Sequence, residues 1–205
     1  MPTVKEVLND TKKRLKEQGI DTYSLDSSLL ISEVTGLTKI QLVTHDRDEV
    51  TEEQLNRLEN LVKERLKNKP MQYILGHCEF MGLDFKVTEN TLIPRGDTEN
   101  IVEEVIATIE NSGYNTVLDM CTGTGAIAIS VAHYTKAKVT ASDISSKALE
   151  VARENAKILN ADVNFIESDL FENINETFDV LVSNPPYIES EVIPTLMEQV
   201  KDYEP

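Results

Sequence analysis

The chain has few of the residues that mark disulfide-rich, metal-binding or membrane proteins. Its 205 residues include two cysteines, three histidines and no tryptophan. Cys78 and Cys121 do not make a disulfide framework, and the histidines lack the spacing of metal ligands. No apolar run approaches the roughly 18–20 residues that cross a bilayer, and the first residues lack the apolar stretch of a signal peptide. We therefore expect a cytoplasmic protein with no metal site and no membrane partner.

Positive charge is scarce in the second half of the chain. The formal charge of the whole is −16, and residues 90–205 carry 7 basic and 20 acidic side chains, a net −13. A surface this negative repels a polyanion, and phosphate contacts supply most of the affinity for nucleic acids. Direct nucleic-acid binding is therefore not expected.

Hydrophobic periodicity divides the chain into three parts. Residues 1–70 have apolar side chains at helical spacing, with Thr51 and Gln54 placed as a capping box, and predict a small helical bundle. Residues 71–92 alternate around Gly82 and predict a β-hairpin that links two domains. Residues 93–205 begin with a predicted helix and continue as alternating strands and helices, which predicts an α/β domain with a parallel sheet.

The predicted strands of the third part are residues 116–120, 139–142, 163–166 and 178–183, the last of them buried. Helices are predicted over 126–134 and 145–159. Ligands of such sheets bind at the carboxyl ends of the strands. No further strand follows, so we expect the natural polypeptide to be longer and this sheet to be incomplete at its C-terminal side.

A glycine-rich turn follows the first of these strands, in the sequence Asp119-Met120-Cys121-Thr122-Gly123-Thr124-Gly125-Ala126. Gly123 and Gly125 let the backbone approach a ligand closely. Asp143 ends the next strand, where a carboxylate can accept hydrogen bonds from both hydroxyls of a ribose. After the third strand, Asp169 and the Leu170 backbone can meet an adenine edge. This pattern predicts an adenosine-containing cofactor.

The turn also fits the dinucleotide fingerprint of an NAD-dependent oxidoreductase. S-adenosylmethionine (SAM) fits better, because the Asp119 carboxylate suits a sulfonium or amino group and not a pyrophosphate. The chain also lacks a second mononucleotide half, and hydride chemistry does not explain the motif after the last strand. The predicted cofactor-binding residues are Asp119, Cys121, Thr122, Gly123, Thr124, Gly125, Asp143, Asp169, Leu170 and Asn184.

That motif is Asn184-Pro185-Pro186-Tyr187. Its two prolines fix two φ angles, and a residue before proline is biased to extended geometry. The segment can hold a planar –NH2 group, with Asn184 Oδ1 and the Pro185 carbonyl accepting its two hydrogens. Tyr187 then packs against the substrate or the cationic methyl group. We predict Asn184, Pro185 and Tyr187 as catalytic residues, and Asn184, Pro185, Pro186 and Tyr187 as the substrate-binding segment.

Together these motifs resemble those of class I SAM-dependent methyltransferases, which have a Rossmann-like sheet. Two further segments, Pro70–Gly76 and Leu92–Glu99, are similar to segments of the release factor glutamine methyltransferases (the HemK/PrmC family), and the likeness covers essentially the whole chain. The resemblance implies methyl transfer from SAM, leaving S-adenosylhomocysteine, to the side-chain amide nitrogen (N5) of the glutamine in the Gly-Gly-Gln motif of peptide chain release factors. It also implies a role in translation termination and substrate recognition by the helical bundle.

The chain departs from the family pattern at three positions. The family usually has glycine in place of Cys121, proline in place of Gly96 and an aromatic residue in place of Leu170. Two other functions stay open. One is an N6-adenine methyltransferase acting on DNA or RNA, which shares the Asn-Pro-Pro-Tyr motif. The other is an inactive fragment that binds SAM or a partner without catalysing a reaction.

Overall fold

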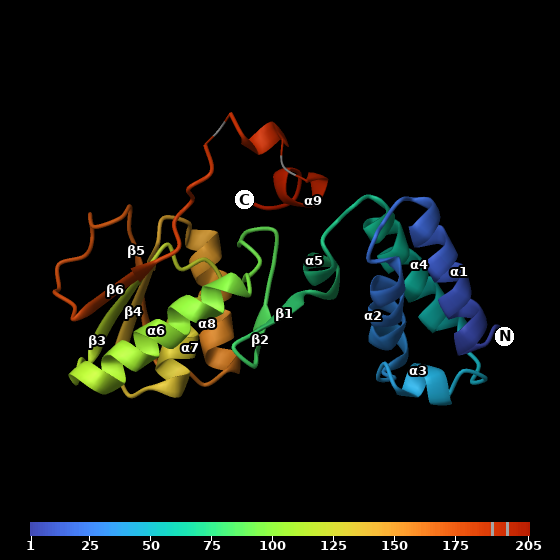
Figure 1. The fold of residues 1–205 in the computed structure, drawn as a ribbon, viewed down its shortest axis with the longest axis horizontal. Helices are drawn as coiled ribbons and strands as arrows, with labels where there is room; N and C mark the ends of the chain where they lie inside the picture. Colours follow the sequence, from blue (N-terminus) through green and yellow to red (C-terminus); the bar gives the residue numbers. More distant parts are fainter. Residues whose placement is uncertain (190, 196) are drawn as a thin grey trace. The chain divides into compact units, whose positions relative to one another are not determined.

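The computed structural model describes residues 1–189, 191–195 and 197–205, which divide into two units, Met1–Leu75 and Gly76–Pro205. The predicted linker, residues 71–92, is shared between them. The predicted hairpin bounds were too wide: Met71–Leu75 form helix α5 in the first unit, and the hairpin, in the second unit, occupies residues 77–86. Figure 1 shows the two units and their elements.

The first unit is a bundle of short helices. They are α1 (Val4–Glu17), α2 (Tyr23–Thr35), α3 (Gln41–Thr44), α4 (Glu52–Leu66) and α5. The predicted capping box at Thr51 and Gln54 is present at the start of α4, and Thr3 and Glu6 form another at the start of α1. Both boxes satisfy helix N–H groups that have no partner within the helix. Local sequence therefore decides where these helices begin.

A buried ion pair joins α2 to α4 in this unit. Arg65 Nε donates to Asp26 Oδ2 over 2.7 Å, and the two side chains are only 3% and 4% exposed. Thr22 Oγ1 donates to the same carboxylate oxygen. A charge pair this far from water holds the two helices in one arrangement, since neither partner can be removed without leaving the other buried and unpaired.

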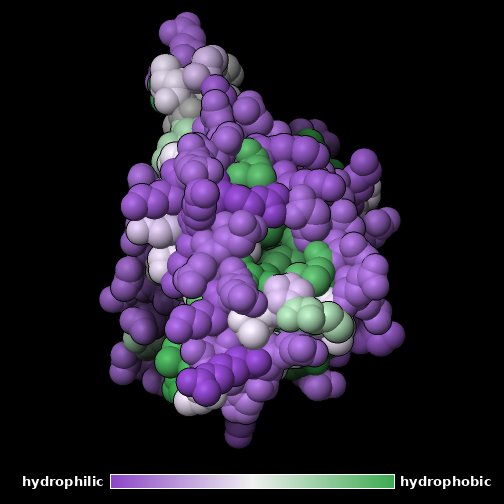
Figure 2. All heavy atoms as spheres, turned by 90° about the vertical axis from the view of Figure 1, so that its right-hand side faces the viewer, coloured by the Kyte–Doolittle hydropathy of each residue, from purple (hydrophilic) through white to green (hydrophobic). Residues whose placement is uncertain are grey.

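Helices α1 and α4 line a groove of about 460 Å³. Its apolar residues include Val7, Leu55 and Leu58. Arg14 bridges the helices by donating to both carboxylate oxygens of Glu59, at 2.7 and 3.0 Å. The face drawn in Figure 2 is mainly hydrophilic, with hydrophobic side chains in a hollow.

The second unit begins with an antiparallel hairpin of β1 (His77–Phe80) and β2 (Leu83–Lys86). Phe80 and Phe85 lie edge to face and are fully buried. The backbone of Met81, in the turn, is held on both sides: its N–H donates to Glu99 Oε1 over 2.7 Å, and its carbonyl accepts from the Tyr134 hydroxyl over 2.6 Å. The hairpin is thus packed into the core of the second unit.

A parallel sheet follows, as predicted, with the strand order β5-β4-β3-β6. The strands are β3 (Thr116–Met120), β4 (Lys138–Asp143), β5 (Val163–Glu167) and β6 (Val180–Ser183). Helices α6 (Asp97–Ser112), α7 (Ala126–Tyr134) and α8 (Ser146–Ile158) pack beside it (Figure 1). The chain continues through the short helices η1 (Ile193–Thr195) and α9 (Glu198–Lys201). The α/β prediction is confirmed.

The last strand was predicted to begin at residue 178 and to be buried, and both predictions were wrong. β6 begins at Val180, two residues later than predicted. Asp179, just before it, is already joined to β3, because its backbone N–H donates to the Thr116 carbonyl and its carboxylate accepts from the N–H groups of Asn115 and Thr116. β6 also lies at the edge of the sheet in the described residues, and its Leu181 side chain is half-exposed. A run of apolar residues does not distinguish an edge strand from a central one.

Candidate functional site

The candidate site lies where three neighbouring strands end. Met120 of β3 is in register with Ser142 of β4 and with Ser183 of β6. The Ser183 hydroxyl also donates to the Met120 carbonyl over 2.7 Å, which fixes the end of β6 against β3. Cys121, Asp143 and Asn184, each one residue further along, are therefore brought to the same edge of the sheet. This edge is where ligands of parallel sheets bind.

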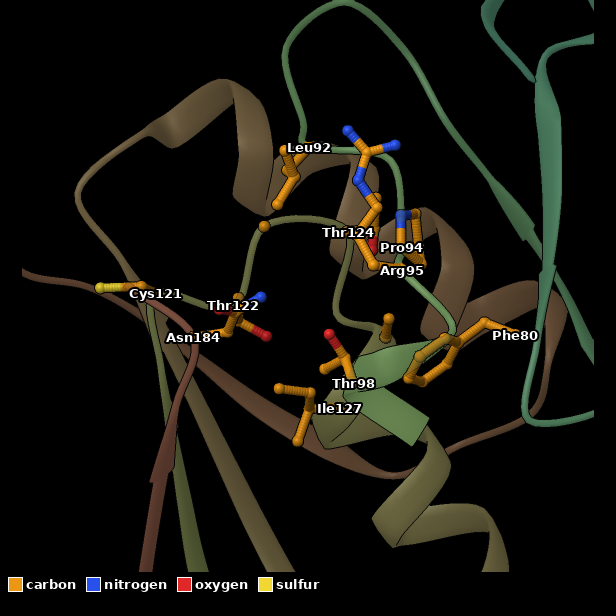
Figure 3. A pocket seen from close by; sticks show the side chains of 12 residues that line it. Phe80, Leu92, Pro94, Arg95, Thr98, Cys121, Thr122, Thr124, Ile127 and Asn184 are labelled. Carbon is orange, nitrogen blue, oxygen red and sulfur yellow. The ribbon is translucent and has the colours of Figure 1, made fainter. Parts of the chain in front are cut away.

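The glycine turn (Cys121–Gly125) is shaped by hydrogen bonds to β4. Thr122 N–H donates to the Ser142 carbonyl over 3.0 Å, and Gly123 N–H donates to Asp143 Oδ2 over 2.9 Å. Cys121, Gly123 and Gly125 all have positive φ, of 63°, 56° and 80°. This conformation favours glycine, which accounts for the family's usual glycine in place of Cys121. In Figure 3 the Cys121 side chain points away from the other labelled side chains.

Gly125 is needed for space as well as for its backbone angles. A Cβ at this position would lie 2.8 Å from Ile129 Cδ1 and 3.2 Å from Ala152 Cβ. A Cβ at Gly123 would meet nothing within 4 Å. The two glycines therefore have different roles: Gly125 lets the turn pack on α7 and α8, and Gly123 leaves open space on the ligand side.

Asp119 is completely buried beneath the turn. Its Oδ2 accepts from Thr122 Oγ1 over 2.5 Å and from Ala128 N–H over 3.1 Å. Burial raises the pKa of the Asp119 carboxyl to about 7, against the opposing effect of these two hydrogen bonds. Its Oδ1 has no hydrogen-bond partner within the described chain. A buried acceptor without a donor is costly, so this atom is suited to a donor or cation supplied by a ligand.

Asp143 uses both carboxylate oxygens to hold backbone. Oδ2 accepts from Gly123 N–H, and Oδ1 accepts from Ser145 N–H over 2.9 Å. Each carboxylate oxygen has a second lone pair. Asp143 can thus fix the turn and still accept hydrogen bonds from the hydroxyls of a ribose.

A cavity of about 70 Å³ opens between the turn and the loop before α6. Figure 3 shows Thr122 and Asn184 on one side, and Leu92, Pro94 and Arg95 on another. The full lining is Phe80, Leu92, Pro94, Arg95, Thr98, Cys121, Thr122, Gly123, Thr124, Ala126, Ile127 and Asn184. Sequence reasoning assigned no site role to Phe80, Thr98 and Ile127, because their apolar or helical context is typical of core.

The Asn-Pro-Pro-Tyr segment (Asn184–Tyr187) reaches the cavity only through its first residue. Asn184 is half-buried, and Pro185, Pro186 and Tyr187 are exposed, with Tyr187 80% exposed. Within the described part of the chain, neither the Asn184 side chain nor the Pro185 carbonyl has a hydrogen-bond partner. Both acceptors are therefore available to a ligand.

Asp169 and Leu170 lie apart from the cavity lining. They follow β5 and are exposed, and Leu170 has a positive φ of 46°. Ser168 shapes this corner, because its hydroxyl donates to the Leu170 carbonyl and accepts from Asn173 N–H. Asp169 and Leu170 thus lie at the carboxyl end of β5, which is the strand next to β4 and Asp143.

Arg95 ties the cavity wall to the end of the chain. Its Nη2 donates to both carboxylate oxygens of Glu204, at 2.7 and 2.6 Å, and the Glu204 side chain is nearly buried. Burial raises the pKa of Glu204, although the Arg95 charge opposes that shift. Gly96, the next residue, has a φ of −55°, which proline also adopts. The glycine that stands here in place of the family's proline therefore keeps the same backbone angle.

The residues that the structure describes contain neither a metal-binding cluster nor a membrane-spanning helix. No group of three or more His, Cys, Asp or Glu side chains is arranged to hold a metal ion. The described helices are all too short or too polar to cross a bilayer.

The chain matches known sequences along most of its length. Residues 6–76 match the family described as the PrmC N-terminal domain, and residues 101–200 match the methyltransferase small domain. The release factor glutamine methyltransferase of Clostridium acetobutylicum is 43% identical over 208 residues, which cover 98% of this chain and 73% of that protein. The proteins of the same description from Fusobacterium nucleatum and Geobacter sulfurreducens are 44% and 38% identical, and the matches cover 98% and 99% of this chain but 58% and 72% of those proteins.

Proposed function

Since the chain belongs to the release factor glutamine methyltransferase family, we propose that it transfers the methyl group of SAM to the side-chain amide nitrogen of the glutamine in the Gly-Gly-Gln motif of peptide chain release factors. The proposal makes the protein an enzyme of translation termination and places it in the cytosol with its substrate. Its fold is that of a class I methyltransferase.

One observation carries the proposal. Asn184 lines the cavity beside the glycine turn, next to the pairing of Ser183 with Met120, and the Pro185 carbonyl is the next backbone acceptor along the chain. Neither Asn184 Oδ1 nor that carbonyl has a hydrogen-bond partner in the described residues. The two hydrogens of a planar –NH2 group match two acceptors on a rigid segment. A primary carboxamide fits this pair, and the preceding strand fixes its distance from the turn.

The residues at the ends of β3, β4 and β5 fit SAM. Asp119 Oδ1 lacks a donor, and the cofactor's positive charge and ammonium group suit that buried oxygen. Asp143 retains lone pairs for the ribose hydroxyls, and Asp169 with the Leu170 backbone is left for the adenine edge. The 70 Å³ cavity is smaller than the roughly 300–1,000 Å³ of a typical ligand pocket, so Asp143, Asp169 and the Leu170 backbone would hold the part of the cofactor that does not fit inside it.

The chain's own groups activate the amide by positioning it. Bound SAM supplies an electrophilic methyl group. An amide nitrogen is a weak nucleophile, because its lone pair is delocalised into the carbonyl. Hydrogen bonds from the amide to Asn184 Oδ1 and the Pro185 carbonyl raise the electron density on its nitrogen. They also orient the nitrogen lone pair towards the methyl group, and such positioning can lower the activation barrier by several kcal/mol. S-adenosylhomocysteine would be the leaving group, and the N–H proton passes to solvent after transfer, so no general-base histidine is needed. Tyr187 covers the bound substrate.

Charge favours a protein substrate over the alternative, adenine in DNA or RNA. Residues 90–205 have a net charge of −13, and a nucleic-acid enzyme needs a basic stripe along its substrate. The chain spans about three quarters of the Clostridium acetobutylicum protein, so a SAM-binding fragment without turnover is the other alternative.

Mass spectrometry of the substrate tests the proposal. Release factor incubated with SAM and the protein should gain one methyl group on the Gly-Gly-Gln glutamine. Methylation of adenine in RNA or DNA, with the release factor unchanged, would contradict it. SAM binding without methylation of any substrate would favour the fragment alternative.

The roles within the site are tested by Asn184→Ala. We expect turnover to fall at least about 100-fold, the usual loss when an enzyme loses one hydrogen-bonding group that stabilises its transition state. The Kd for SAM should stay within a few-fold of the wild-type value. Asn100→Ala is the matched control, because Asn100 is exposed on α6 and bonds only its own helix. An equal loss of SAM binding and turnover would contradict this division of roles.

A further inference from the structure

A buried asparagine connects the hairpin to the glycine turn. Asn155, on α8, is completely buried. Its Nδ2 donates to the Thr124 carbonyl in the turn and to the Lys86 carbonyl in β2, both over 3.0 Å. Its Oδ1 accepts from Lys86 N–H over 2.8 Å. We propose that Asn155 is a positioning residue that couples the order of the hairpin to cofactor binding at the turn; the proposal rests on the SAM site argued above.

The side chain is chemically matched to this position. An amide offers two donors and one acceptor oxygen, and here all three meet backbone groups. The pairing with Lys86 has the form of a strand pairing, one N–H···O bond in each direction. Turning the amide over would set its –NH2 against the Lys86 N–H, so one orientation alone satisfies the site. Leucine or methionine would leave three backbone groups buried without partners.

The contact with the turn is reinforced from the same helix. Ala152, three residues before Asn155 on α8, is the residue that a Cβ on Gly125 would approach within 3.2 Å. Thr124 is thus fixed by a hydrogen bond and Gly125 by close packing, both against one face of α8. The turn cannot shift relative to α8 without breaking the bond from Asn155.

The contact with the hairpin leads back to the same cavity. Lys86 pairs with His77 at the open end of the hairpin. Phe80 pairs with Leu83 at the other end of the same two strands and lines the cavity beside the turn. Lys86 itself does not line the cavity. Hydrogen exchange at the Lys86 amide therefore reports on a position that a ligand in the cavity does not contact. A change in this exchange on cofactor binding would have to be transmitted through other residues.

Coupling of this kind is reciprocal. If cofactor binding stabilises the Thr124 position, it also stabilises the bonds from Asn155 to Lys86, and loosening those bonds weakens cofactor binding by the same factor. Typical factors are about 5 to 150. The expected result is a cofactor-dependent slowing of hydrogen exchange at the Lys86 amide that requires Asn155.

The test measures SAM affinity by calorimetry and exchange at the Lys86 amide with and without SAM. In the wild type, SAM should slow this exchange at least about fivefold. In Asn155→Ala the amide should exchange fast and not respond to SAM, and the Kd for SAM should rise at least about fivefold. Lys86→Ala is the matched control: it keeps the backbone bonds, removes only the exposed ion pair with Glu154, and should behave as wild type.

A second pair of variants separates coupling from general destabilisation. Ile109→Ala removes a buried side chain at the far end of α6 and should lower stability without changing the SAM affinity. Asn155→Asp covers the case in which the alanine variant does not fold. Its protonated carboxyl can accept from Lys86 N–H and donate to one carbonyl, whereas its carboxylate faces two carbonyls. The ratio of its Kd to that of wild type should therefore fall as the pH is lowered.

The outcomes distinguish this inference from the proposed function. The coupling alone is overturned if Asn155→Ala binds SAM as tightly as the wild type. It is also overturned if SAM binds the wild type without slowing hydrogen exchange at the Lys86 amide. Failure of the wild type to bind SAM overturns the cofactor assignment and the coupling with it.

Discussion

The Gly123 amide donates a hydrogen bond of 2.9 Å to Asp143 Oδ2, and this bond joins the turn after β3 to the end of β4. Because Asp143 also holds Ser145 N–H, one carboxylate supports both the glycine turn and the start of α8. The residue expected to bind the ribose is therefore also the residue that shapes the loop around the cofactor.

Asp143→Ala should weaken SAM binding by about 10- to 100-fold. The substitution removes the acceptor of Gly123 N–H, and hydrogen bonds to charged groups are worth about 1.5–3 kcal/mol each. Calorimetric titration with SAM measures the effect, and Asp162→Ala, at an exposed position before β5, is the control. A Kd within twofold of wild type would contradict the assignment.

The two glycines of the turn should respond differently to alanine. Gly125→Ala should destabilise the fold by about 2–5 kcal/mol, because overlap of the new Cβ with Ile129 costs about 1–3 kcal/mol and the φ of 80° adds about 1–2 kcal/mol. Gly123→Ala faces open space, so only the backbone angle opposes it, at about 1–2 kcal/mol. Urea unfolding measures both free energies. Equal losses at the two positions would mean that packing on α7 and α8 does not distinguish them.

Asp119 should make stability decrease with pH in the acidic range. Its pKa is about 7 in the fold and 3.8 as the reference value, so the folded protein retains a proton that the unfolded chain releases between these pH values. The stabilising contribution is full below about pH 4 and is lost as the pH rises to about 7. At about 1.4 kcal/mol per pKa unit, the loss is on the order of 4 kcal/mol at most.

Asp119→Asn isolates this contribution. Its free energy of unfolding minus that of wild type should increase from pH 4 to pH 7 and level off above pH 7. Wild-type affinity for SAM should rise over the same range, since the ionised carboxylate attracts the cationic cofactor. A pH-independent difference between the two proteins would place the pKa of Asp119 outside this range.

The buried pair in the helical unit should be sensitive to removal of one partner. Arg65→Met leaves Asp26 buried without its cation and should cost about 3–5 kcal/mol, whereas Asp26→Leu combined with Arg65→Met should recover most of that loss. Arg57→Met is the control, because its ion pair with Glu33 is exposed and should contribute less than about 1 kcal/mol. Denaturant unfolding of the four proteins gives the comparison.

Local sequence predicted most of the helices and strands, and it predicted which residues lie at the strand ends. Periodicity gave α7 its observed bounds, Ala126–Tyr134, and the capping box at Thr51 gave the start of α4. The glycines, Asp143 and Asn184 could be predicted because each occupies a fixed place relative to a strand or turn close to it in sequence. Only neighbours along the chain are needed for such inferences.

Tertiary structure decided the rest. Periodicity could not place β6 at the sheet edge or bring Phe80 into the cavity. Periodicity also did not indicate that Asn155 pairs with Lys86, 69 residues earlier, because in the sequence Asn155 is only another residue of a predicted helix. The pKa of Asp119 likewise depends on burial beneath the turn. A partner distant in sequence, and the loss of water around a charge, arise only when the whole chain has packed.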